Sequence, residues 1–196
     1  EKLKNDFEEK LRIADVYENL KKTANGEIVS DNSKITFERY IMGSYFEQVL
    51  YYANLRFSKM TGGRYEIVRG ESRDKRISAG LEISVRDNFN NKERDISSLS
   101  GGESFQASLA LALGLSDIIQ QRNGGIRLDS IFIDEGFGSL DNDSLASAIE
   151  TLNDLTGNGN RLVGIISHIS ELKNSIGNKI EVVGTKSGSS IKIITD

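Results

Sequence analysis

Two short apolar runs separated by a helix-like stretch constrain the fold of this chain more than any other feature. Residues 130–134 (SIFID) and 161–167 (RLVGIIS) each suit one strand, and residues 142–155 between them suit a helix. Nearly continuous apolar sequence is typical of strands that are buried on both faces, as in parallel sheets. This order of elements predicts an α/β fold.

The remaining strands are predicted from alternating apolar and polar residues. Residues 64–69 (RYEIVR) and 81–86 (LEISVR) predict a small antiparallel sheet. Residues 180–184 and 191–194 predict a terminal hairpin across a Gly/Ser turn. The chain should therefore form a mixed sheet with flanking helices.

Three further helices are expected, and the first two leave an alternative open. Residues 104–121 are rich in Ala and Leu, which predicts a buried helix. Residues 1–24 and 36–60 place apolar groups three or four positions apart, which predicts one apolar face on each. Such a pair either covers a core or forms the foot of a coiled coil. The apolar period changes after residue 60, which separates a helical segment, 1–60, from a segment of strands and helices, 61–196.

Composition excludes several classes of site. The 196 residues contain no Cys and one His, which excludes disulfides, zinc–thiolate sites, thiol nucleophiles and His-rich metal centres. No apolar run approaches the roughly 18 residues that span a membrane, and cytoplasmic localisation is expected. With 25 basic and 29 acidic residues, the net charge of −4 argues against one large basic face that coats nucleic acid.

A phosphate-binding helix start is suggested by residues 99–103 (LSGGE), which precede the Ala/Leu-rich helix. The first turn of a helix has backbone N–H groups without partners, and the helix dipole adds partial positive charge there. Ser100, Gly101 and Gly102 would let a phosphate approach these groups closely. Taken alone, the same pattern also describes a Ser N-cap in a Gly turn.

Two adjacent carboxylates, Asp134 and Glu135, end the first apolar strand. Ligands of parallel α/β sheets bind at the carboxyl ends of the strands. One carboxylate could hold Mg²⁺, directly or through water, and the next could orient or deprotonate an attacking water. Because side chains alternate along a strand, the two acids need not have the same role.

Two further residues lie close to strand ends in this half of the chain. Asp141 ends residues 138–141 (GSLD), a loop that leads into a helix, and His168 follows the second apolar strand. A His at a strand end could face the same crevice as Asp134. The sequence has no GxxxxGK[ST] loop, so the usual wrapping of ATP phosphates is missing.

The motifs LSGGE, IFIDE, SLD and a strand-end His, in this order, resemble the signature motif, Walker B motif, D-loop and switch His of ATP-binding-cassette ATPases. Transporter cassettes usually continue Asp-Glu-Pro, whereas this chain continues Asp-Glu-Gly-Phe-Gly-Ser-Leu-Asp. That run, with residues 104–117, 164–168 and 62–65, resembles the SbcC family of SMC-like DNA-repair ATPases. The likeness extends from about residue 35 to the end. It implies the C-terminal lobe of an ABC-type ATPase head over residues 61–196 on a coiled-coil base over residues 1–60.

The resemblance implies a role for each matching residue. Asp134 would ligate Mg²⁺, Glu135 would position the hydrolytic water, and His168 would contact the γ-phosphate of ATP. Asp141 would cross to a second head. Ser100, Gly101 and Gly102 would contact the γ-phosphate of ATP bound mainly to that second head. The phosphate loop would come from the N-terminal half of the same protein, so this chain alone should not hydrolyse ATP.

The resemblance also implies partners. SbcC-like heads act with an SbcD-type Mn²⁺ nuclease in DNA repair and recombination, and the complex has exonuclease and endonuclease activity on DNA ends and hairpins. The nuclease would dock at the coiled-coil base, and the protein would be cytoplasmic and nucleoid-associated, with no membrane partner. Candidate DNA contacts, which are equally explained as a solvated edge, are Arg64, Arg69, Arg73, Lys75 and Arg76. A structural SMC-type head that bridges DNA without a nuclease is the alternative, and a transporter cassette is a third.

Overall fold

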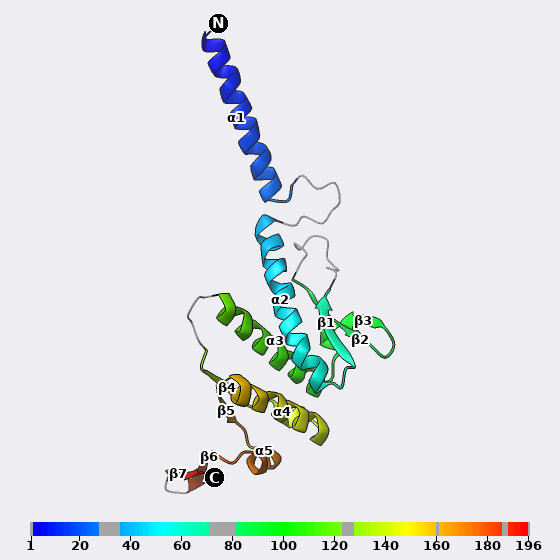
Figure 1. The fold of residues 1–196 in the computed structure, drawn as a ribbon, viewed down its shortest axis with the longest axis vertical. Coiled ribbons are helices and arrows are strands. Elements are labelled where there is room, and N and C mark those ends of the chain that lie inside the picture. Colours follow the sequence, from blue (N-terminus) through cyan, green and yellow to red (C-terminus); the bar gives the residue numbers. More distant parts are fainter. Residues whose placement is uncertain are drawn as a thin grey trace. The chain divides into compact units, whose positions relative to one another are not determined.

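The chain forms two compact units, Glu1–Ile126 and Arg127–Asp196. The computed structural model describes residues 2–27, 36–70, 81–122, 128–159, 161–185 and 188–195. Figure 1 shows helices and strands in both units, as expected for an α/β chain. None of the helices within those ranges is both long and apolar enough to span a bilayer.

The core of the first unit lies between helices α2 (Phe37–Met60) and α3 (Gly101–Arg122). They approach closely at Gly114, where an added Cβ would lie 2.6 Å from the carbonyl oxygen of Val49. The buried side chain of Gln106 donates to the Met60 carbonyl oxygen at 3.1 Å, and the Arg56 guanidinium lies 2.7 Å from the Asp117 carboxylate. The prediction of a helix at residues 104–121 is confirmed, although α3 begins three residues earlier and is buried on part of its surface only, with Leu115 49% exposed.

Helix α1 (Lys2–Ala24) differs from α2 in having no buried residue. The carboxyl-terminal part of α2 buries Val49, Ala53 and Phe57, whereas Phe37 and Tyr40 near its start are exposed. Covering a core therefore describes only the second part of α2. The apolar residues of α1 that stay exposed are Leu3, Phe7, Leu11, Ile13, Val16, Tyr17 and Leu20.

A three-stranded antiparallel sheet completes the first unit. Strands β1 (Tyr65–Arg69) and β2 (Ile83–Asp87) pair as predicted, and β2 pairs with β3 (Lys92–Asp95). Strand β3 was missed because its sequence, KERD, has no apolar residue. Before β1, Gly62 and Gly63 have positive φ of 59° and 79°, which lets the chain reverse directly after α2.

The second unit holds the predicted strand–helix–strand order. Strand β4 (Ser130–Asp134) pairs in parallel with β5 (Leu162–Ile166), and α4 (Asn142–Gly159) contacts β5. A short helix, α5 (Ser170–Ser175), was not predicted. The predicted terminal hairpin is present as strands β6 (Lys179–Thr185) and β7 (Gly188–Ile194).

The expectation that β4 and β5 are buried on both faces was wrong. Ile131 and Ile133 are half-buried on one face, but Phe132 on the other face is 72% exposed, as are Leu162 (65%) and Ile166 (58%). Register places these three residues on one face, together with Asp134. Hairpin β6–β7 likewise exposes one apolar face, made of Ile180, Val182, Ile191 and Ile193. The residues that the structure describes thus cover only one face of the parallel strands.

Candidate functional site

The twin carboxylates lie at the carboxyl end of β4, where the chain turns sharply. The Glu135 amide donates to the Ile166 carbonyl oxygen at 2.9 Å, which continues the β4–β5 pairing one residue past Asp134. Glu135 and Gly136 have φ of 57° and 97°. Left-handed backbone at a residue with a side chain is uncommon, and it is enriched at functional sites.

His168 lies against Glu135. Its Nδ1 is 3.1 Å and 3.0 Å from the two Glu135 carboxylate oxygens, and both side chains are solvent-accessible. The two residues follow adjacent parallel strands, so their contact results from the β4–β5 register. The structure thus brings together two of the predicted site residues, beside Asp134.

Asp141 immediately precedes helix α4 and caps its amino-terminal end. Its Oδ1 accepts a hydrogen bond from the Ser144 amide at 2.8 Å, and this bond lowers the pKa of the Asp141 carboxyl. Between Glu135 and Asp141, the short 3₁₀ helix η2 (Phe137–Ser139) is anchored by the fully buried Phe137 ring. The loop that presents Asp141 is therefore fixed at both ends.

The predicted phosphate cradle forms the start of α3. The Glu103 amide donates to Ser100 Oγ at 3.3 Å, and the Ser100 amide donates to Glu103 Oε2 at 2.9 Å. This reciprocal pair is a capping box, so Ser100 is an N-cap residue. Gly101 and Gly102 occupy the first turn, where backbone amides have no acceptor within the helix.

Glu103 is a residue whose contribution sequence reasoning missed. Burial raises the pKa of its carboxyl, but hydrogen bonds from Ser100 and Tyr65 outweigh burial, and the net pKa is lowered. The spacing of Ser100 and Glu103, Ser-x-x-Glu before an apolar helix, is a known sign of a capping box and could have revealed this pair.

The predicted site residues divide between the two units. Ser100, Gly101 and Gly102 lie in the first unit, and Asp134, Glu135, Asp141 and His168 lie in the second. Of these residues, Glu135 and His168, both in the second unit, are in contact.

The donor chemistry of Asp134 suits Mg²⁺ held together with a nucleotide. No group of three or more Asp, Glu or His side chains could hold a metal by itself in the described ranges. Mg²⁺ commonly uses one or two carboxylates together with substrate phosphates and water. The exposed Asp134 at a strand end fits that pattern, whereas a resident metal held by protein alone does not.

The candidate DNA contacts are partly neutralised. Arg64 lies 3.4 Å from the Asp87 carboxylate and stacks on Tyr65, and Arg69 lies 2.6 Å from Glu47. Arg73, Lys75 and Arg76 lie outside the described residues. The two described arginines therefore offer less free positive charge than the sequence suggested.

Comparison with known proteins agrees with the motif order. Residues 71–154 match the family model described as "SbcC/RAD50-like, Walker B motif". The chain is 49% identical over 173 residues to the SbcC component of the SbcCD nuclease of Vibrio cholerae, covering 88% of this chain and 17% of the relative. It is 55% identical over 153 residues to the SbcC component of Staphylococcus epidermidis, covering 78% and 15%. The chain thus spans about a sixth of the length of these curated relatives.

The fold is that of SMC ATPase heads. A structure from work on ATP-driven dimerization and DNA-stimulated activation of SMC ATPases superimposes with a TM-score of 0.62. The match covers 80% of this chain and 89% of that one at 15% identity, so it concerns the fold alone. Taken with the sequence identity to the SbcC components of SbcCD nucleases, it shows that this chain belongs to the SbcC family and has the fold of an SMC-type ATPase head.

Proposed function

We propose that this chain is the C-terminal half of an ATPase head that clamps ATP against a second head and regulates an SbcD-type nuclease on DNA ends and hairpins. The observation that supports it most is the contact between Glu135 and His168 at neighbouring strand ends, beside Asp134. Phosphoryl transfer depends mainly on positioning and charge neutralisation, and this trio supplies part of both.

The residues of the second unit would act on ATP bound in the same head. Asp134 would hold Mg²⁺, and His168 would donate to the γ-phosphate. Glu135 would orient the attacking water and accept its proton. In the structure His168 lies against both Glu135 oxygens, so we propose that ATP binding separates this pair.

The signature residues would act on ATP held mainly by the second head. The amides of Gly101 and Gly102 belong to the first turn of α3, where the helix dipole favours an anion. Ser100 Oγ would add a further contact. Asp141 would reach across to the second head. ATP would then shift the equilibrium from separate to closed heads by its higher affinity for the closed state.

The N-terminal half of the protein is the first partner that we propose. It would supply the phosphate loop that this sequence lacks. The exposed apolar faces of β4–β5 and β6–β7 support the need for this partner, because an apolar sheet face is normally buried. Phe132 and Ile191 would become buried when the two halves assemble.

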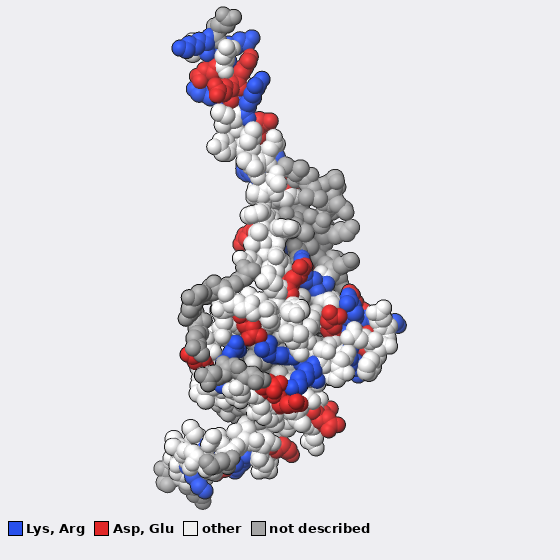
Figure 2. Space-filling view, viewed as in Figure 1, with Lys and Arg blue, Asp and Glu red and all other residues white. Residues whose placement is uncertain are grey.

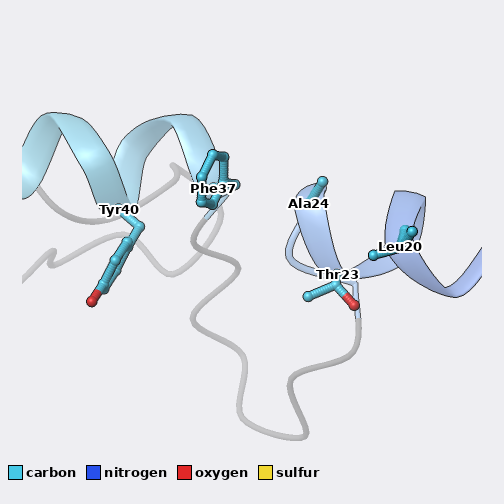
Figure 3. A pocket seen from close by; sticks show the side chains of 5 residues that line it. All are labelled: Leu20, Thr23, Ala24, Phe37 and Tyr40. Atoms are coloured by element: carbon cyan, nitrogen blue, oxygen red, sulfur yellow. The ribbon is translucent and has the colours of Figure 1, made fainter.

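The nuclease would dock where α1 and α2 meet. A hollow of about 380 Å³ lies there, and Figure 3 shows its lining of Leu20, Thr23 and Ala24 from α1 with Phe37 and Tyr40 from α2. In Figure 2, charged side chains gather at the amino-terminal end of α1 and uncharged ones dominate toward α2. An apolar surface on a helical base could receive a helical segment of the partner.

A structural SMC-type head without a nuclease is the second candidate, because this chain and SMC heads have the same fold. The identity of about half to the SbcC components of two SbcCD nucleases supports the nuclease-linked function more strongly.

The test measures ATP hydrolysis by this chain alone and after co-expression with its N-terminal half. We expect no turnover from the chain alone and ATP-dependent dimers with turnover from the assembly. Glu135→Gln in the assembly should keep dimerisation and lower kcat by about 10²-fold or more, because the general base is lost. Glu171→Gln on α5 is the matched control. Turnover by the isolated chain, or full activity of Glu135→Gln, would refute the assignment.

A further inference from the structure

Behind the signature motif, a chain of hydrogen bonds leads from the antiparallel sheet to Ser100. The Tyr65 hydroxyl on β1 hydrogen-bonds the Glu103 carboxylate, and Glu103 Oε2 accepts from the Ser100 amide at 2.9 Å. Tyr65 is 2% exposed, so its hydroxyl has little access to competing water. Ser100 is therefore linked, through Glu103, to a buried residue of another element.

Arg94 on β3 holds the same network from a second side. Its Nη2 donates to the Tyr65 hydroxyl oxygen at 3.2 Å, and its Nη1 donates to the Ser98 carbonyl oxygen at 3.1 Å. The guanidinium also lies 5.3 Å from the centre of the Tyr65 ring. One side chain thus fixes both the segment before the motif and the tyrosine behind it.

We infer that Tyr65 and Arg94 are positioning residues for the signature motif. They set the location of Ser100 and of the first α3 amides relative to the sheet, by way of Glu103. Neither residue would touch ATP. This inference rests on the proposed function, because Ser100 has to meet a phosphate for its position to affect activity.

This network contains more hydrogen bonds than are needed to start helix α3. A capping box needs only its Ser and Glu side chains, which already satisfy each other. Here the Glu carboxylate is also held by a buried phenol, and the phenol by a guanidinium that bonds back to the loop. Linked hydrogen bonds of this kind limit the freedom of the group at their end. A motif that meets a phosphate on another molecule benefits from such fixation, since ordering it at the moment of binding lowers affinity.

The experiment uses the complete ATPase that contains this chain. Tyr65→Phe keeps the ring and removes the hydroxyl. Arg94→Lys keeps the charge and removes the guanidinium, which donates to Ser98 and Tyr65 at the same time. Each should lower ATP-driven dimerisation and kcat by about three- to tenfold, the size expected for losing one hydrogen bond. Binding of a fluorescent ATP analogue to separate heads should stay unchanged, because it depends mainly on the other half.

A double-mutant cycle separates positioning from general stability. If Tyr65 acts through Ser100, Tyr65→Phe should have little further effect on kcat in a Ser100→Ala background. Tyr51→Phe, at a 63% exposed residue of α2, and Arg86→Lys on β2 are the matched controls, because strand pairing places Arg86 on the opposite face of the sheet from Tyr65 and Arg94.

The outcomes are distinct. Wild-type activity in both single variants would overturn the positioning role and leave the proposed function standing. The same conclusion would follow if Tyr65→Phe lowered kcat equally in the wild type and in the Ser100→Ala variant. Absence of ATP-driven dimerisation in the wild type would refute the proposed function itself. If Tyr65→Phe fails to fold, Arg94→Lys, at a half-exposed site, decides the question.

Discussion

At the scale of single residues, two carboxylates in this chain are held in unlike ways. Glu135 occupies a left-handed backbone conformation, which costs on the order of 1–3 kcal/mol and persists only when neighbours enforce it. The Ile166 carbonyl and the adjacent Gly136 supply that constraint. Glu103 instead sits in favourable geometry, with two donors stabilising its charged form. The strained residue is the one proposed to perform chemistry, and the relaxed one supports it.

The lowered pKa of Glu103 predicts a pH dependence of stability. Since the folded-state pKa lies below the ordinary value, the stabilisation is present above about pH 4.5 and is lost as pH falls through the folded pKa. Glu103→Gln keeps an acceptor for the Ser100 amide but cannot titrate. We expect the melting temperature of the wild type to fall more steeply than that of Glu103→Gln between about pH 5 and pH 3. Parallel curves from thermal unfolding would show that Glu103 does not contribute.

At the scale of elements, the crossing of α2 and α3 depends on one glycine. A Cβ on Gly114 would lie 2.6 Å from the Val49 carbonyl oxygen and 2.7 Å from the Ala53 amide nitrogen, and both atoms belong to the α2 backbone. Backbone atoms cannot rotate away as a side-chain end can. The two helices would have to separate to admit even a methyl group.

Gly114→Ala should therefore destabilise the chain by about 1–3 kcal/mol, although Ala favours helices. Gly157→Ala is the control, because Gly157 lies in α4 with no atom within 4 Å of the added Cβ. That variant should be neutral or more stable by up to about 1 kcal/mol. Urea denaturation of both variants measures the difference. A Gly114 variant as stable as the wild type would mean that α2 and α3 are not in close contact in solution.

At the scale of the whole molecule, the main feature is the apolar surface left open. Phe132 is 72% exposed and lies over Gly164, so close that a Cβ there would meet its ring at 2.6 Å. The same side of the parallel pair exposes Leu162 and Ile166. This surface is where we expect the N-terminal half to pack.

Phe132→Asp should weaken association with the N-terminal half by about tenfold or more, as expected for a buried aromatic anchor. The chain itself should lose little stability, because surface changes usually cost within about 0.5 kcal/mol. Phe89→Asp, at a 77% exposed Phe on the turn between β2 and β3, is the control. Titration of the two halves by calorimetry provides the affinities. Equal affinities for the two variants would place the docking surface elsewhere.

The sequence predicted the elements better than their surroundings. Periodicity located α2, α4 and the terminal hairpin closely, because each has a clear apolar pattern. It missed β3, whose four residues are all charged, and its pairing depends on β2 rather than on its own composition. The apolar strands β4 and β5 indicated burial on both faces, yet a pattern cannot say which chain provides the cover. The contact of Glu135 with His168 followed from strand order, whereas the link from Arg94 to Ser100 depends on tertiary packing that no local motif encodes.

The β4–β5 sheet has two strands, which affects whether the chain stays unassociated after synthesis. Within the described ranges each strand pairs on one side only, which leaves a free row of backbone donors and acceptors next to an uncovered apolar face. Isolated pairs of strands are marginal in water and prone to join with copies of themselves. Without its complement, this segment should therefore associate with copies of itself as its concentration rises, and assembly with the other half should suppress that association.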